Sequence, residues 1–261
     1  MSLLIQSHDL SLSIGNKTLL NNISFEVNKG DYLCIVGPNG AGKSSLLKLL
    51  MGILPISEGN LLLNNKLVSA YSQKQLAQLI SYVPQSSGRQ LPFSVAEFVK
   101  MARYPFHSAL SDWQPADQQA LENAFDITDT GQFSSRQMST LSGGECQRVM
   151  IAAALCQQSP ILLLDEPTSF LDPHHQVEVH RLIRTLNQQH QITIIEVSHD
   201  LNHASQHSKQ ILALKGGETL WLGQADKFLE AKRLHALYDQ DFIFLDHPQT
   251  GAKIALPDEQ L

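Results

Sequence analysis

The sequence predicts an α/β domain built around a mostly parallel β-sheet. Apolar runs of strand length recur along the chain, and segments with helical patterns lie between them. The runs are continuously apolar, which is typical of strands covered on both faces, as in a parallel sheet. The expected sheet strands are residues 32–36, 79–83, 161–164, 192–197 and 211–214.

Two of the helices between these strands carry end signals. A helix is expected at 43–51 because Gly52 follows it, and glycine is favoured just beyond a helix C-terminus. Another helix is expected at 173–187, with Asp172 as its N-terminal cap and Pro173 at its first position.

Three segments depart from this alternation. Residues 1–30 alternate and are rich in turn residues, which favours antiparallel strands beside the main sheet. Helical patterns at 95–102 and 117–125, with little strand signal around them, predict an inserted helical subdomain. The chain end predicts two short strands around a turn at Thr250–Gly251. The single predicted domain, 1–261, is therefore divided into a core with the antiparallel subdomain (1–86 and 156–240), a helical subdomain (87–155) and a C-terminal β extension (241–261).

Composition and charge exclude several classes of protein. The chain has 261 residues with 19 Lys and Arg against 25 Asp and Glu, and its net charge of −6 argues against broad binding to nucleic acid. No stretch approaches the roughly 18 unbroken apolar residues of a membrane helix. The N-terminus lacks the basic start and the apolar core of a secretory signal. The three cysteines, Cys34, Cys146 and Cys156, are too sparse for a disulfide framework, so we expect buried thiols and a cytosolic location.

A glycine-rich loop, GPNGAGKSS at 37–45, stands between an expected strand and an expected helix. Residues 37–44 match G-x-x-x-x-G-K-S, a motif whose glycines let backbone N–H groups converge on phosphate oxygens. The loop also opens onto a helix N-terminus, which favours an anion. A tight glycine turn is the alternative, but strand, motif and helix in register favour a nucleotide. The residues expected to bind it are Gly37, Pro38, Asn39, Gly40, Ala41, Gly42, Lys43, Ser44 and Ser45.

Three side chains of this loop have expected roles on a nucleoside triphosphate. Lys43 is expected to reach the β- and γ-phosphates, and the Ser44 hydroxyl is expected to bind Mg²⁺. Ser45 is expected to donate to the α-phosphate.

An acidic pair follows the strand expected at 161–164. Asp165 emerges at the carboxyl end of that strand, where α/β sheets place their ligands, and is expected to hold Mg²⁺ through its water shell. Glu166 is expected to act as the base that orients the attacking water. A solvated strand end is the alternative, and the preceding phosphate loop argues against it.

Two further polar residues follow apolar strands. His199, in VSHD, is expected on the same rim of the sheet, as a γ-phosphate contact that also steadies Glu166. Gln85, in SYVPQ, is expected to reach the metal or the attacking water. A histidine or a glutamine in such a place is, by itself, more often structural or solvated. The phosphate loop and the acidic pair in the same chain favour a functional role for both residues.

The run LSGGECQRVMIAAAL at 141–155 begins with a helix-capping pattern. Ser142 and Glu145 have the spacing of a capping box, which by itself requires no further function. Gly143 and Gly144 lie in the first turn, where each lowers helix propensity by roughly 1 kcal/mol relative to alanine. Two such glycines suggest that the bare N–H groups there face a second anion.

These motifs, in this order and spacing, resemble the ATPase subunit of an ABC transporter, and the resemblance covers nearly the whole chain. It implies the ABC ATPase fold, with a P-loop NTPase core, an antiparallel β subdomain and a helical subdomain. It also implies ATP and Mg²⁺ as cofactors and a head-to-tail dimer with two ATP molecules at its interface. In that dimer Ser142, Gly143 and Gly144 would contact the γ-phosphate held by the other copy, and Asp172 would lie at the dimer seam.

One feature of the chain departs from the family pattern, and another indicates a particular group within the family. Most family members carry an aromatic residue near the start that stacks on adenine, whereas this chain has Ile14 there, so apolar contact is expected to replace stacking. Residues 95–125 and the C-terminal tail resemble importers for metal chelates, namely ferric siderophores, haem and cobalamin. The ARYP turn at 102–105 and Trp113 either pack the helical subdomain or lie near a groove for the permease's coupling helix.

The predicted function is ATP binding and hydrolysis that powers an ABC importer for a metal chelate. An importer for another solute, such as a free metal ion or an oxyanion, is the alternative. A soluble ABC ATPase acting on ribosomes or DNA, a P-loop kinase or GTPase, and a non-hydrolysing scaffold are disfavoured by the single domain, the LSGGE run, and Glu166 with His199. The expected partners are transmembrane permease subunits, a second copy of the chain and, indirectly, a substrate-binding protein, with no nucleic acid. The expected location is peripheral, on the cytoplasmic face of the inner membrane.

Overall fold

The computed structural model describes residues 2–85, 92–108 and 111–258. The chain divides into two compact units. The first unit comprises Met1–Ala70 and Thr193–Leu261, and the second comprises Tyr71–Ile192. The predicted division into a core, a helical subdomain and a C-terminal extension stays a prediction. Residues 87–91 of the predicted helical subdomain lie outside the described part of the chain.

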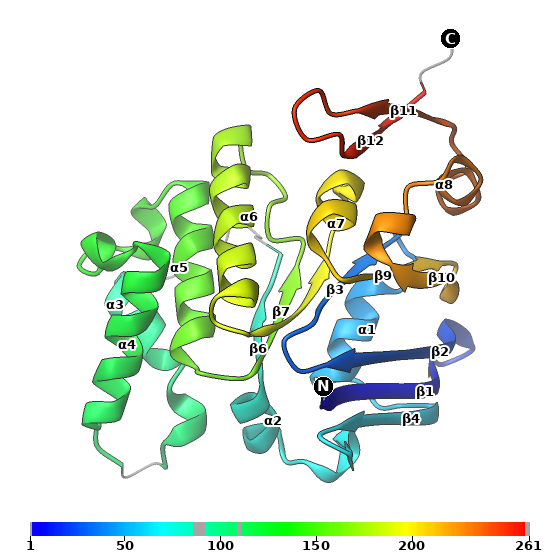
Figure 1. The fold of residues 1–261 in the computed structure, drawn as a ribbon. Coiled ribbons are helices and arrows are strands. Elements are labelled where there is room, and N and C mark those ends of the chain that lie inside the picture. Colours follow the sequence, from blue (N-terminus) through cyan, green and yellow to red (C-terminus); the bar gives the residue numbers. More distant parts are fainter. Residues whose placement is uncertain (1, 86–91, 109–110, 259–261) are drawn as a thin grey trace. The chain divides into compact units, whose positions relative to one another are not determined.

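The first unit opens with an antiparallel sheet, as the sequence predicts for residues 1–30. Its strand order is β2-β1-β4-β5, and the dark blue and teal arrows of β1, β2 and β4 lie side by side in Figure 1. Alternate side chains of β2 are buried from Ile23 to Val27, because successive residues of a strand point to opposite faces. The strands are β1 (Leu3–Ile14), β2 (Lys17–Asn28), β4 (Glu58–Leu63) and β5 (Lys66–Leu67).

A second sheet of the first unit carries the strands that position the phosphate loop. Within this unit the strand order is β10-β9-β3-β8. Strand β3 runs parallel to both β8 and β9, and β10 pairs antiparallel with β9. All residues of β3 and β8 are buried, which explains why both read as continuous apolar runs. The strands are β3 (Tyr32–Val36), β8 (Thr193–Val197), β9 (Gln210–Lys215) and β10 (Glu218–Gln224).

The helices of the first unit pack on this sheet and on a C-terminal hairpin. Phe228, Leu234 and Leu237 join Val36 of β3 in one buried apolar cluster. The side chain of Asn202 ties the hairpin to α7, because its amide donates to Ala255 O at 3.1 Å and its oxygen accepts from Ala255 N at 2.8 Å. The elements are α1 (Lys43–Leu50), η1 (Val68–Ala70), α7 (Leu201–His207), η5 (Ala225–Lys227), α8 (Ala231–Tyr238), β11 (Phe242–Asp246) and β12 (Lys253–Pro257).

The second unit joins a parallel strand pair to a group of helices. Strands β6 and β7 are parallel, and the helices α3, α4 and α5, green in Figure 1, enclose an apolar cluster that includes Val99, Leu121 and Val149. The elements are α2 (Gln73–Leu79), β6 (Ile80–Val83), α3 (Val95–Met101), η2 (Tyr104–Phe106), α4 (Pro115–Thr128), η3 (Gly131–Phe133), η4 (Met138–Thr140), α5 (Gly143–Cys156), β7 (Ile161–Asp165) and α6 (Pro173–Gln188). Among the residues that the structure describes, no helix is long and apolar enough to cross a membrane.

The predicted α/β class is confirmed, with parallel pairing of β3 to β8 and β9 and of β6 to β7, and the differences are local. The strand expected from residue 79 begins at Ile80, because Leu79 ends α2. Helix α2 was not predicted, although Ser72 and Gln75 form a capping box, a pattern that indicates the start of a helix. Strand β10 was also missed; the glycine pair at 216–217, between β9 and β10, is a hairpin signal.

A buried ion pair organises the ARYP turn. Arg103 and Asp117 are 5% and 3% exposed, and Arg103 Nε donates to Asp117 Oδ1 at 2.8 Å. Arg103 Nη1 also donates to Cys156 O at 3.0 Å, so one guanidinium joins the turn to α4 and α5. Tyr104 points the other way and is 79% exposed. Packing therefore accounts for Arg103, whereas Tyr104 remains available at the surface.

The three cysteines match the expected thiol environments in part. Cys34 and Cys156 are buried and Cys146 is partly buried, and all three are free thiols. Burial raises the pKa of each of them, so none is set up as a thiolate at neutral pH.

A buried carboxyl group that the sequence analysis did not single out lies in β8. Glu196 is fully buried, its Oε2 accepts a hydrogen bond from the Tyr32 hydroxyl, and that hydroxyl lies 3.4 Å from His203 Nε2. Burial raises the pKa of Glu196 from 4.5 to about 7, and the charge of Asp200 adds to the shift. The ionised form is therefore disfavoured in the folded chain.

We predict that Glu196→Gln flattens the pH dependence of stability. An acid with a raised pKa in the folded state binds its proton more tightly there than in the unfolded chain, so stability is lost as pH rises from about 4.5 to about 7. Over this range the wild-type free energy of unfolding should fall by on the order of 3 kcal/mol more than that of the variant. Urea unfolding at several pH values measures this difference, with the exposed Glu58→Gln as control. Parallel pH profiles for wild type and Glu196→Gln would contradict the prediction.

Candidate functional site

The phosphate loop joins β3 to α1 and has no room for side chains at two of its glycines. Gly42 has a φ of 99°, and a Cβ there would lie 2.5 Å from Leu20 Cδ2 and 2.9 Å from Leu19 O. A Cβ on Gly37 would collide with the carbonyl oxygen of Leu214. Both glycines are therefore required by packing against neighbouring strands as well as by the backbone conformation at Gly42.

Lys43 is folded back over the loop. Its side chain is buried, and Nζ donates to Gly37 O at 2.7 Å and to Pro38 O at 3.1 Å. No side chain caps α1 at Gly42, and the first turn of α1 holds no acidic residue. Ser44, in that first turn, is exposed. A helix start with these features is a favourable place for an anion.

Two other predicted residues of the first unit lie near the surface. His199 is exposed, in the turn between β8 and α7. That turn is braced by its neighbours, since Ser198 Oγ accepts from Asp200 N at 3.1 Å and Asp200 caps α7 through His203 N at 2.8 Å. Ile14, at the end of β1, is 54% exposed.

Asp165 ends β7 in the second unit and is nearly buried, with 7% of its surface exposed. The Tyr82 hydroxyl of β6 donates to Asp165 Oδ2 at 3.2 Å. Burial and the neighbouring Asp165 carboxylate raise the pKa of Tyr82 above its usual value, so the phenol stays a donor. This contact orients one oxygen of Asp165.

Gln85 and Glu166 are brought together by the fold. Gln85 Nε2 donates to Glu166 Oε2 at 2.6 Å, and Ser169 Oγ donates to the same oxygen at 3.0 Å. Glu166 has a φ of 51°, a left-handed conformation that is uncommon for a residue with a side chain. Strain of this kind persists where surrounding contacts hold it, and the two hydrogen bonds are such contacts.

The LSGGE run forms the capped start of α5, as the sequence predicts. Ser142 Oγ accepts from Glu145 N at 3.3 Å, and Glu145 Oε2 accepts from Ser142 N at 2.8 Å. The Ser142 N–H holds the pKa of Glu145 below its usual value, and Arg136 adds to this from 3.2 Å. Ser142 and Gly143 are exposed, whereas Gly144 is buried.

The two glycines of this run have different reasons to be glycine. A Cβ on Gly144 would lie 2.9 Å from His175 Cβ and closer still to the imidazole ring. A Cβ on Gly143 would lie 3.4 Å from Leu171 Cδ2, which is an ordinary contact. Packing inside the chain is thus sufficient to explain Gly144. The second anion remains a prediction for this helix start, and Gly143 is the glycine that packing leaves unexplained.

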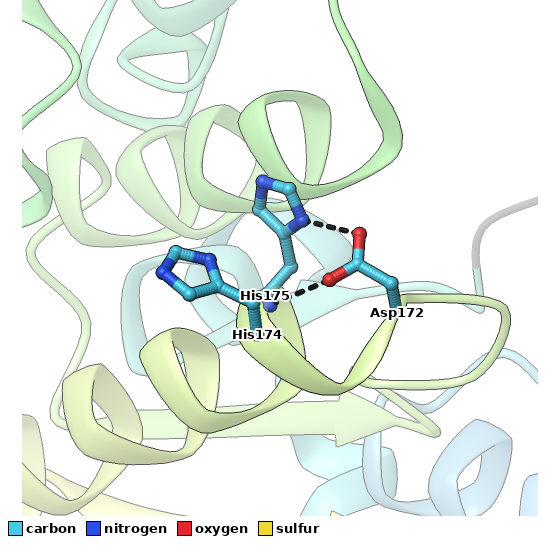
Figure 2. A group of neighbouring side chains, drawn as sticks. All are labelled: Asp172, His174 and His175. Atoms are coloured by element: carbon cyan, nitrogen blue, oxygen red, sulfur yellow. Dashed lines mark hydrogen bonds and ion pairs between the residues drawn. The ribbon is translucent and has the colours of Figure 1, made fainter.

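Asp172 caps α6, as predicted, and also holds an imidazole (Figure 2). Its Oδ1 accepts from His175 N at 3.1 Å, and its Oδ2 lies 2.6 Å from His175 Nδ1. The hydrogen bond from His175 lowers the pKa of Asp172. His174 stands beside His175, and the ligand atoms of the three residues lie within 4.8 Å of one another, a spacing that a metal ion could use. Both carboxylate oxygens of Asp172, however, already serve the first turn of α6.

Sequence reasoning missed three residues that position the predicted ones. Tyr82 precedes Gln85 on the same strand end, Ser169 follows Glu166 by one turn, and His175 follows its cap Asp172 by the same spacing. The spacing from Asp172 to His175 was a usable signal, because side chains three residues apart at a helix start face one another. The contacts of Tyr82 could not be read from the sequence.

Several known proteins are similar to this chain. A model of the ABC transporter family matches residues 20–169. The petrobactin import ATP-binding protein FpuD of Bacillus anthracis is 32% identical over 97% of this chain and 93% of that protein. This chain belongs to the ABC transporter family. The resemblance drawn from the sequence motifs is therefore confirmed.

Two further relatives and one solved structure are also similar to this chain. The hemin import ATP-binding protein HmuV of Streptomyces coelicolor is 37% identical over 95% of this chain and 88% of that protein. The ABC transporter ATP-binding protein YvrA of Bacillus subtilis is 38% identical, but this chain spans 55% of its length. A solved metal-chelate type ABC transporter, in an inward-facing conformation, matches 98% of both chains with a TM-score of 0.86 and 27% identity. The predicted ABC ATPase fold is confirmed by this likeness.

We predict that Gly42→Ala damages the ABC ATPase fold more than Gly40→Ala does. Both glycines have positive φ, which costs alanine about 1–2 kcal/mol. At Gly40 a Cβ would meet nothing within 4 Å, whereas at Gly42 it would press on β2 and add about 1–3 kcal/mol of overpacking. Urea unfolding of both variants measures the difference. Equal losses of unfolding free energy would show that packing against β2 is not the constraint.

Proposed function

We propose that this chain binds and hydrolyses ATP to power an ABC importer for a metal chelate. The observation that carries the nucleotide part is the phosphate loop, whose carbonyl oxygens accept from the buried Lys43 and which leads into the uncapped start of α1. The binding residues are those predicted from the sequence, Gly37 to Ser45. When ATP binds, Lys43 would leave its two carbonyl partners and contact the β- and γ-phosphates. An ammonium group binds an anionic phosphate oxygen more strongly than it binds a neutral carbonyl oxygen.

Mg²⁺ is the proposed second cofactor, and the donor groups of the chain suit it. Ser44 offers an exposed hydroxyl in the first turn of α1, and Asp165 offers a carboxylate that Tyr82 orients. Gln85 offers an amide oxygen. Hydroxyl, carboxylate and amide oxygens are the ligands that Mg²⁺ prefers. When bound, the ion would neutralise charge on the phosphates.

Glu166 is the proposed base for the attacking water. Its carboxylate is held in place by Gln85 and Ser169, so it meets the need for a group whose position is set before the reaction. Gln85 would help to hold the same water, and His199 would contact the γ-phosphate. Phosphoryl transfer depends mainly on positioning and charge neutralisation, and these three residues would supply the positioning.

The proposed assembly is a head-to-tail dimer of two copies. In it, the exposed start of α5, residues 142–144, would contact the γ-phosphate bound by the other copy, and Asp172 would lie at the seam. The free N–H groups at this helix start suit an anion. Transmembrane permease subunits would be the second type of partner, with a substrate-binding protein acting through them. The chain would work at the cytoplasmic face of the inner membrane.

The proposed cargo is an iron-siderophore, haem or cobalamin-type chelate. Support comes from FpuD and HmuV, whose names refer to petrobactin and hemin import, and from the likeness to a metal-chelate type transporter. An importer for a free metal ion or an oxyanion is the alternative, and a non-transport ABC ATPase is a further one.

The cargo is tested by uptake in cells that lack this chain. Complementation with the wild-type chain should restore uptake of radioactive iron from a ferric siderophore or haem, and Glu166→Gln should not. Restored uptake of a free metal ion or oxyanion, without any chelate, would overturn the chelate proposal and leave the ATPase proposal intact. Restored growth without any uptake would favour a non-transport role.

We predict that Lys43→Ala lowers ATP affinity at least about 30-fold, because removal of one partner from a buried charge pair costs about 2 kcal/mol or more. Titration with a fluorescent ATP analogue measures the affinity. Lys48→Ala is the matched control, because Lys48 lies on the exposed side of the same helix and should bind as wild type does. Wild-type affinity in Lys43→Ala would remove Lys43 from the nucleotide site.

We predict that Glu166→Gln binds Mg-ATP but stalls as a closed dimer. Glutamine has nearly the same size and shape as glutamate, but its amide cannot accept the proton of the attacking water. Size-exclusion chromatography with and without ATP detects the dimer, and phosphate release measures turnover. Wild-type turnover in this variant would remove Glu166 from the role of base.

A further inference from the structure

One imidazole ring stands between the start of α5 and the start of α6. His175 fills the space beside Gly144, where even a methyl group would overlap it. The same ring is tied to Asp172 through Nδ1 at 2.6 Å, as Figure 2 shows. Asp172 is in turn fixed by capping α6 through His175 N. His175 thus links the segment ending at Asp172 to the glycine pair of the LSGGE run.

We propose that His175 is a positioning residue for the helix start at 142–144. This proposal rests on the proposed function, in which that helix start contacts the γ-phosphate bound by the other copy. The ring, held by Asp172, sets how closely the first turn of α5 approaches α6. Asp172, the Ser142 hydroxyl and the Gly143 N–H group would then meet the other copy in one fixed arrangement.

The chemistry of the ring suits this role. An imidazole is flat, so it packs against a bare glycine backbone with little excess volume, and its polar edge can still be held by a carboxylate. Asp172 fixes the ring because its two oxygens serve two different groups of His175, the backbone N–H and Nδ1. His174, in contrast, is exposed and has no part in the packing at Gly144.

If His175 positions this helix start, its loss should lower turnover without changing ATP affinity. ATP would be bound by the phosphate loop of the same copy, which lies in the first unit, so loss of His175 should leave ATP affinity unchanged. Closure on the other copy would need the helix start in place. A misplacement of about 1 Å at a site of phosphoryl transfer can lower the rate roughly 100-fold.

The test uses five variants of the full chain: His175→Ala, Gly144→Ala, the double variant, His175→Asn and the control His174→Ala. Measurements are kcat and KM for Mg-ATP, the unfolding temperature, and ATP-driven dimerisation in the Glu166→Gln background. His175→Asn keeps a donor for Asp172 but fills less of the space beside Gly144. It therefore separates the hydrogen bond from the packing.

We expect His175→Ala to lower kcat roughly 10- to 100-fold with KM unchanged, and to weaken the dimer of the Glu166→Gln background. His175→Asn should recover part of kcat, and His174→Ala should match wild type. Gly144→Ala should be the least active single variant, and the double variant should exceed it because the clash with the ring is gone. If Gly144→Ala fails to fold, recovery of a cooperative unfolding transition in the double variant reports the same relief.

Three results would overturn the role of His175. These are wild-type kcat in His175→Ala, a rise in KM that accounts for the whole loss, or equal effects of Gly144→Ala whether residue 175 is His or Ala. The proposed function fails separately. If the wild-type chain does not hydrolyse ATP, or if Glu166→Gln forms no ATP-dependent dimer, the function itself is wrong and the variants at 175 are not the cause.

Discussion

Gly37, Gly42 and Gly144 lie where a β-carbon would collide with a neighbouring segment, and this steric constraint shapes both glycine-bearing loops of the chain. At Gly42 the space beside the backbone is occupied by Leu19 and Leu20 of β2, and at Gly37 it is occupied by Leu214 of β9. The phosphate loop is therefore packed against two strands of the first unit. Helix α1 begins directly after this loop without a side-chain cap, and such a helix start favours an anion.

The LSGGE run meets the same steric requirement with a different neighbour. Gly144 lies against an imidazole, and Ser142 and Gly143 remain exposed. One glycine is thus used to dock α5 on α6, and its neighbour presents backbone to the outside. Packing against His175 accounts for one of the two glycines that lower helix propensity, and the proposed contact with another copy is the reason offered for Gly143.

Uncharged donors orient two carboxylates of the second unit, Asp165 and Glu166. Tyr82 orients Asp165, and Gln85 with Ser169 orients Glu166, which sits in a left-handed conformation. Hydroxyl and amide donors direct a carboxylate without adding a positive charge to compete with a metal ion or a proton. The arrangement suits groups that must bind a cation or accept a proton during turnover.

The sequence by itself determined several features that depend on consecutive or nearly consecutive residues. The phosphate loop, the capping box of Ser142 and Glu145, and the cap at Asp172 are local, so their spacing was enough to predict them. The apolar runs of β3, β7 and β8 were also sufficient, because full burial leaves a continuous pattern. Strand β10 was missed because it is only partly buried or exposed along its length and lacks such a pattern.

Tertiary structure alone decided which distant residues meet. The contact of Gln85 with Glu166, the burial of Glu196 beside Tyr32, and the union of Arg103 with Asp117 and Cys156 join residues far apart in the chain. The place of His175 against Gly144 belongs to the same class. Such contacts depend on how helices and strands pack, and packing is set by the summed shapes of many side chains. The spacing of residues along the sequence is therefore not enough to predict these contacts.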